Sequence, residues 1–84
     1  MSKPMRHLHP LEQLPIGHEV SVGNMRGVVI GVQTVPAVPC GMIAVHTVNL
    51  THKLVREFGN RNKIIEMDKP KNQRIGYCSI YIED

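Results

Sequence analysis

Aromatic side chains are scarce in this 84-residue chain, which contains one Phe, two Tyr and no Trp. A hydrophobic core must therefore be assembled from Val, Ile, Leu and Met, and the β-branched members of this set favour strands. The length suits one small domain with a thin core, for which self-association would bury additional apolar surface. We expect a single, mainly β domain that forms homo-oligomers.

Long hydrophobic runs are absent as well, because no apolar stretch approaches the ~18 residues of a membrane-spanning helix. The N-terminus lacks the basic segment and apolar run that mark a signal peptide. Cys40 and Cys78 are the only cysteines, and their spacing leaves open whether they lie close together. These absences predict a cytoplasmic protein with reduced thiols and no membrane partner. Cys78 is expected in the core, on one strand face with Ile80 and Ile82.

Catalytic motifs are equally hard to find. The sequence has no P-loop, nucleophile elbow, dinucleotide fingerprint or paired-carboxylate motif, and its seven acidic residues are mostly isolated. His7 and His9 share one face of an extended segment, but a metal site needs further ligands, which no close spacing supplies. We therefore expect a non-enzymatic protein with no catalytic residue, no metal and no cofactor.

Alternation of apolar and polar residues is the main structural signal that the sequence does contain. It runs over 18–22 and again over 26–34, and it predicts two strands with one buried face each. Gly23, Asn24 and Gly27 lie between the two runs, where a hairpin needs a turn or bulge.

Three further strands are predicted, at 42–50, 63–67 and 74–82. Strand 42–50 is apolar on both faces and is expected to be covered on both sides, with His46 satisfied in a core or at a subunit interface. Leu50, Leu54 and Phe58 recur every four residues. This spacing favours a short helix or helical turn over 51–58, and strand continuation is the alternative.

The segment Ile16-Gly17-x-x-Val20-x-Val22, followed by Gly27-Val28-Val29-x-Gly31-Val32, resembles the opening hairpin of SH3-like barrels of the KOW and Tudor-like type. The resemblance covers residues 16–33. With the other predicted strands it implies a small, five-stranded, strongly curved all-β barrel over 16–84. The aromatic cage with which Tudor domains bind ligands is not visible, so methyl-lysine recognition is not implied.

Residues 1–15 precede this domain as an N-terminal arm. Pro4, Pro10 and Pro15 interrupt the segment and deny it backbone donors, so that at most one or two helical turns fit. Leu8, Leu11 and Leu14 still give it apolar character. The arm is expected to pack across the barrel or onto a second subunit.

Positive charge is concentrated between residues 53 and 74, where seven cations face three acids, although the whole chain has a net charge of only +3. Tyr77 and Tyr81 are four apart on the last predicted strand, so they would point to the same face. Rings that stack on bases beside cations that hold phosphates form a single-stranded nucleic-acid platform. The competing interpretation is a solvated charged face, with both rings covering a second apolar face. The residues of this candidate site are Arg56, Arg61, Lys63, Lys69, Lys71, Arg74, Tyr77 and Tyr81.

A loop with two prolines, at 35–41, is more apolar than a solvated loop usually is. Val35, Val38 and Met42 are the candidate contacts for a protein partner, as in small accessory or inhibitor proteins of viral or mobile-element type. We prefer this protein-interaction hypothesis because it needs the fewest assumptions, and nucleic-acid binding is the alternative. A second alternative is an oligomer that sequesters a small anion such as a nucleotide, held by His52, Arg56 and Arg61.

Overall fold

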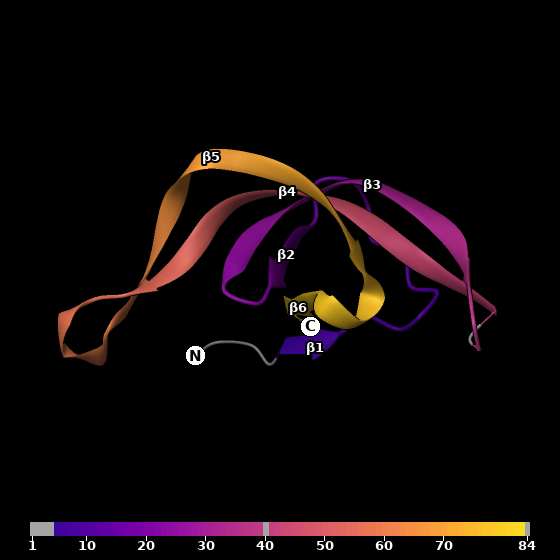
Figure 1. Ribbon diagram of the computed structural model, residues 1–84, viewed down its shortest axis with the longest axis horizontal. Helices are drawn as coiled ribbons and strands as arrows, with labels where there is room; N and C mark the ends of the chain where they lie inside the picture. Colours follow the sequence, from indigo (N-terminus) through magenta and orange to yellow (C-terminus); the bar gives the residue numbers. More distant parts are fainter. Residues whose placement is uncertain (1–4, 40, 84) are drawn as a thin grey trace.

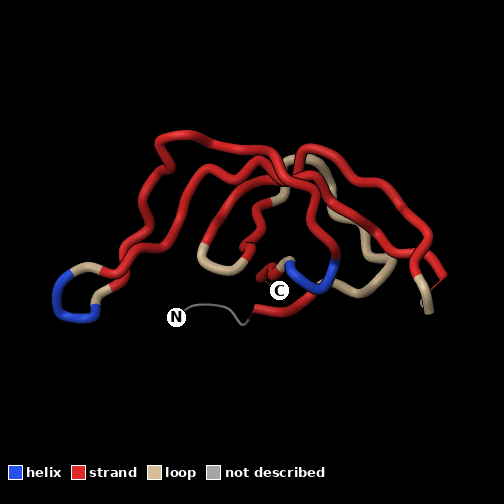
Figure 2. Tube along the Cα trace, viewed as in Figure 1, coloured by secondary structure: helices blue, strands red, loops and turns tan. Residues whose placement is uncertain are grey.

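A computed structural model describes residues 5–39 and 41–83, and it shows one antiparallel sheet of six strands in the order β1-β6-β2-β3-β4-β5 (Figure 1). The predicted all-β fold is confirmed. Two short 3-10 turns, η1 (Phe58–Asn60) and η2 (Tyr77–Ser79), interrupt the strands (Figure 2). The strands are β1 (Met5–His7), β2 (Glu19–Val22), β3 (Met25–Ala37), β4 (Gly41–Arg56), β5 (Asn62–Gly76) and β6 (Tyr81–Glu83).

The sheet differs from the predicted barrel in strand number and in closure. The sixth strand comes from the N-terminal arm, where β1 pairs with β6. Among the described residues, β1 and β5 form the two edges of the sheet, and their pairing to each other is not seen. The strands β3, β4 and β5 are 13, 16 and 15 residues long. These lengths are well above the usual five or six residues, and the strands extend outward as two hairpins (Figure 1).

The helix expected over 51–58 is wrong, and the alternative of strand continuation is correct. β4 runs as a strand to Arg56, with Lys53 opposite Ile65 and Val55 opposite Lys63 in β5. A β-branched residue such as Val55 fits a strand well, and β5 supplies a hydrogen-bonding partner that a sequence pattern does not reveal.

The boundaries of the two predicted strands 63–67 and 74–82 also differ from the expectation. Residues 62–76 form a single strand, and the polar stretch around Pro70 is a bulge within it. Between the pairs Leu50–Lys71 and His52–Glu66, β5 carries three more residues than β4. A proline fits there because a bulge releases it from the ladder of hydrogen bonds.

Two long hairpins project from opposite sides of the molecule, which measures 46 × 28 × 21 Å (Figure 1). The first, here the Pro-rich hairpin (residues 33–45), joins β3 to β4. The second, here the basic hairpin (residues 52–66), joins β4 to β5 and ends at η1. In each one, two strands run beyond the core as a ribbon (Figure 2).

The core lies on one face of β3 and β4, here the inner face. Alternate residues of β4 from Ala44 to Leu50 are completely buried there. The arm covers them: the Ala44 N–H donates to the Pro10 carbonyl at 2.7 Å, and Leu8 and Leu14 are buried. The arm therefore packs across its own domain, which is one of the two outcomes expected for it. The core cluster consists of Leu8, Leu14, Val20, Val29, Val48, Leu50, Ile75, Ile80 and Ile82.

A close approach at Gly27 allows the sheet to bend where the basic hairpin leaves the core. A Cβ atom at this position would collide with the backbone carbonyl oxygen of Asn49. The β3–β4 register shifts at the same point, so that Gly27 opposes Leu50 while Arg26 opposes His52. Such a bulge increases the local bend, and only glycine permits the approach.

Candidate functional site

The tip of the Pro-rich hairpin brings together the three residues predicted to contact a partner. Val38 is completely exposed, and Met42 is 43% exposed. Val35 is half-buried and pairs with Ile43, one step along the ladder from Met42. The hairpin thus places these three residues at one end of the molecule, but Val35 and Met42 point to opposite faces of the ribbon because Val35 shares its face with Ile43. Cys40, which lies between them, is outside the described residues.

The tip of the basic hairpin carries an exposed aromatic ring, Phe58, which belongs to none of the sites predicted from the sequence. Phe58 is completely exposed in η1, where Gly59 has a φ of 79°. Arg56, Glu57 and Arg61 line a shallow depression beside it. A lone Phe beside a glycine at a strand–strand turn would have been the available signal, but the four-residue spacing placed Phe58 on a helix.

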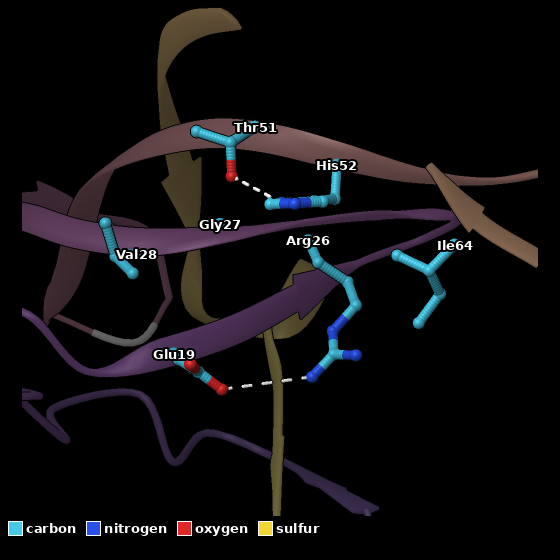
Figure 3. Close-up of a pocket in the computed structure, with 7 residues that line it drawn as sticks. All are labelled: Glu19, Arg26, Gly27, Val28, Thr51, His52 and Ile64. Carbon is cyan, nitrogen blue, oxygen red and sulfur yellow. Dashed lines mark hydrogen bonds and ion pairs between the residues drawn. The ribbon is translucent and has the colours of Figure 1, made fainter. Parts of the chain in front are cut away.

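The residues predicted to hold a small anion are brought together only in part. Arg56 and Arg61 line the same depression, whereas His52 lines a different pocket on the flank of the basic hairpin. The Thr51 hydroxyl lies 2.8 Å from His52 Nδ1 (Figure 3). Two arginines at an open, exposed tip do not enclose a nucleotide.

The cations predicted to hold phosphates do not form one row. Residues paired across a sheet point to the same face. Lys71 is opposite the buried Leu50 on the inner face, whereas Arg74 is opposite Thr47 on the outer face. Lys69 lies in the β5 bulge, and Lys63 is 3.5 Å from the Glu57 carboxylate. The charge expected along 53–74 is therefore divided between faces and elements.

The expected tyrosine face is wrong, because the last predicted strand is broken at residues 77–79. Tyr77 begins η2 and packs partly buried against the core, while Tyr81 belongs to β6. The Tyr81 ring centroid lies 4.3 Å from that of His7, in β1. The chain turns here because it leaves the edge strand β5 and crosses to a position between β1 and β2. The same turn exposes Cys78, which was expected in the core.

A hollow of about 920 Å³ lies between the terminal strands, β2 and the basic hairpin. It combines exposed apolar side chains with carboxylates. Glu19 and Arg26, on the paired strands β2 and β3, form an ion pair in its lining at 3.9 Å, and both are well exposed. A smaller adjoining pocket shares Glu19, Arg26 and Ile64 with it (Figure 3). Besides Arg26 and His18, the lining of this hollow includes Met5, Glu19, Leu54, Ile64, Tyr81 and Glu83.

Two ionisable groups in and beneath the N-terminal arm have shifted pKa values. Arg6 binds both carboxylate oxygens of Glu12, at 2.9 and 2.8 Å, and this lowers the pKa of Glu12 to about 2. His46 is completely buried, and its Nε2 accepts the Leu14 N–H at 3.0 Å. Burial lowers the pKa of His46, and the nearby Glu12 carboxylate opposes that effect. The hydrogen bond to His46 joins the arm to β4, whereas the Arg6–Glu12 pair lies within the arm.

The described part of the chain offers no grouping of three or more His, Cys, Asp or Glu side chains suited to a metal ion. Within residues 5–39 and 41–83, no helix has the length and apolarity that crossing a bilayer requires. Comparison with protein-family models, with curated protein sequences and with solved structures finds no match for this chain.

Proposed function

We propose that this protein is a non-enzymatic interaction module that docks onto another protein through the tip of the Pro-rich hairpin. The observation that carries the proposal is the exposure of Val38 and Met42 at the end of a ribbon that leaves the core. Apolar side chains gathered at an exposed tip are typical of a contact surface.

The geometry and composition of the Pro-rich hairpin suit the docking of a partner protein. A two-stranded ribbon is only marginally stable in water, so a partner that covers it adds stability as well as affinity. Pro36 and Pro39 restrict the backbone near the tip, which reduces the conformational entropy lost on binding. No residue of the hairpin between 33 and 45 is charged, so docking there would desolvate no ionised side chain.

The nucleic-acid alternative has less support from the geometry. It was based on a tyrosine face and a run of cations, and Tyr77 and Tyr81 belong to different elements while Lys71 and Arg74 point to opposite faces. The small-anion alternative loses His52 from its set of three. The nucleic-acid alternative is a separate outcome of the experiment that follows.

The test is purification of the tagged protein from the lysate of its own source, followed by chromatography with light scattering and absorbance at 260 and 280 nm. We expect the wild type to co-elute with a second protein in fixed stoichiometry. The Val38→Asp/Met42→Asp double variant should lose that protein, because two carboxylates would be buried at the contact. Gln73→Asp, at an exposed position of β5, is the matched control and should retain it.

Three results would overturn the proposal. In the first, the double variant keeps the second protein as well as the wild type does. In the second, no protein accompanies the wild type. In the third, the 260/280 ratio is high and falls in concentrated salt, which would favour binding of nucleic acid through its phosphates.

A further inference from the structure

The lining of the hollow beside the basic hairpin has the chemistry of a binding surface. Three of its apolar side chains are large and substantially exposed, with exposed fractions of 45% for Met5, 39% for Leu54 and 44% for Ile64. Glu19 and Glu83 add carboxylates to the lining. The complementary ligand is therefore an apolar group, large enough to cover three side chains, with positive charge around it.

The tip of the basic hairpin has the complementary chemistry. Phe58 is completely exposed, and it is the only Phe of the chain. Arg56 and Arg61 lie on either side of it around one depression. Four cations against two acids give residues 52–66 a net charge of +2. Aromatic and arginine side chains are also the ones most often found at the energetic centres of interfaces.

We infer that the basic-hairpin tip of one copy of this chain docks into the hollow of a second copy. Phe58 would cover Leu54 and Ile64 of the neighbour, and Arg56 and Arg61 would face its Glu19 and Glu83. The Glu19–Arg26 ion pair, at 3.9 Å and well exposed, is weak enough to exchange for an arginine of the neighbour. The Pro-rich tip does not fit this receptor, because it carries no cation.

A single copy cannot fill its own hollow in this way. Leu54 and Ile64, which pair with each other in the ribbon, form one wall of the hollow, and Phe58 lies beyond them on the same ribbon. The contact is therefore between a tip and a hollow on different copies, which makes it head-to-tail. Contacts of this kind produce rings if the rotation closes, and open chains if it does not.

This inference extends the proposed interaction function to a second surface, and the two can fail separately. The test uses two charge-reversed variants of the whole protein, followed by light scattering across a concentration series. Arg56→Glu/Arg61→Glu places negative charge on the tip, and Glu19→Lys/Glu83→Lys places positive charge in the hollow. Each variant alone opposes like charges and should remain monomeric at concentrations where the wild type assembles.

An equimolar mixture of the two variants should assemble again, because each tip then meets a hollow of opposite charge. Recovery in the mixture also shows that both variants are folded. Phe58→Ala should weaken self-association roughly 30-fold, the loss typical of a central aromatic anchor. Val38→Asp/Met42→Asp should leave self-association unchanged, which separates this contact from the Pro-rich hairpin.

A monomeric wild type at high micromolar concentration would overturn the inference and leave the proposed function intact. So would charge-reversed variants that assemble as well as the wild type. A mixture that stays monomeric while both variants show the wild-type circular dichroism spectrum would also overturn it. Assembly that is lost with Val38→Asp/Met42→Asp would assign the contact to the Pro-rich hairpin instead.

Discussion

At the scale of single residues, His46 shows how one buried polar group can couple the arm to the sheet. Its Nε2 accepts the Leu14 N–H, so the neutral ring must carry its proton on Nδ1, which has no hydrogen-bond partner among the described residues. A proton on Nε2 would place two donors face to face in a dry core. The fold therefore requires the neutral form of this ring.

The pH dependence of stability follows from that requirement. The unfolded chain protonates His46 near pH 6.5, whereas burial lowers its pKa in the folded state. Below pH 6.5 the unfolded state binds more protons, so the free energy of unfolding should fall as the pH drops, by up to about 1.4 kcal/mol per pH unit. Glu12, with its pKa lowered to about 2, adds a separate loss below pH 4.5.

Urea denaturation at pH 7.5, 6.5 and 5.5 checks this prediction. His46→Gln should flatten the dependence on pH, whatever its effect on absolute stability. The exposed His52→Gln is the matched control, and its free energy of unfolding should change with pH as that of the wild type does. The same pH dependence of the free energy of unfolding in the wild type and in both variants would contradict this account of His46.

At the scale of elements, the N-terminal arm is part of the fold and not an appendage. Its leucines divide sharply: Leu14 is 6% exposed within the core cluster, whereas Leu11 is 60% exposed. The sequence spacing of Leu8, Leu11 and Leu14 resembles a helical stripe, but the chain makes a turn at Pro10 and Leu11, closed by the Glu12 N–H donating to the His9 carbonyl at 3.1 Å. Only the first and last of the three leucines are buried.

Truncation of these leucines should therefore lower the free energy of unfolding by unequal amounts. Leu14→Ala leaves a cavity over the inner face of the sheet, and we expect a loss of about 2–4 kcal/mol in the free energy of unfolding. Leu11→Ala should stay within about 0.5 kcal/mol of the wild type. Chemical denaturation measures both changes, and similar losses for the two variants would show that the arm does not pack as described.

Elements were predictable from the sequence where one face of a strand is buried. Both strands were found, and Val20 is buried as the alternation over 18–22 predicts. In 26–34 the alternating residues Val28, Ile30 and Val32 predicted the buried face, and that face is wrong, because the structure buries Val29 and leaves Ile30 44% exposed. The basic hairpin buries neither face fully, so its apolar residues obey no such rule. Leu54 and Phe58 then happened to match a helical spacing. Only pairing with β5, which is a long-range contact, decides in favour of a strand.

At the scale of the whole molecule, a small core carries two hairpins that reach far beyond it (Figure 1). The candidate surface at the Pro-rich tip could be grouped from sequence because Val35, Val38 and Met42 are neighbours in the chain. The hollow could not, because Met5, Leu54 and Tyr81 meet only after folding. The break at residues 77–79 was hidden for the same reason, since it depends on where β6 finds its partners.

On this account both hairpins are binding surfaces that become covered on assembly. Amide hydrogen exchange tests it most directly, on the dilute protein and on the assembly recovered from its own source. We predict that residues 33–43 and 52–66 exchange quickly in the dilute protein and become protected in the assembly, while β4 from Ala44 to Leu50 is slow in both. Hairpins that exchange equally fast in both samples would contradict the account.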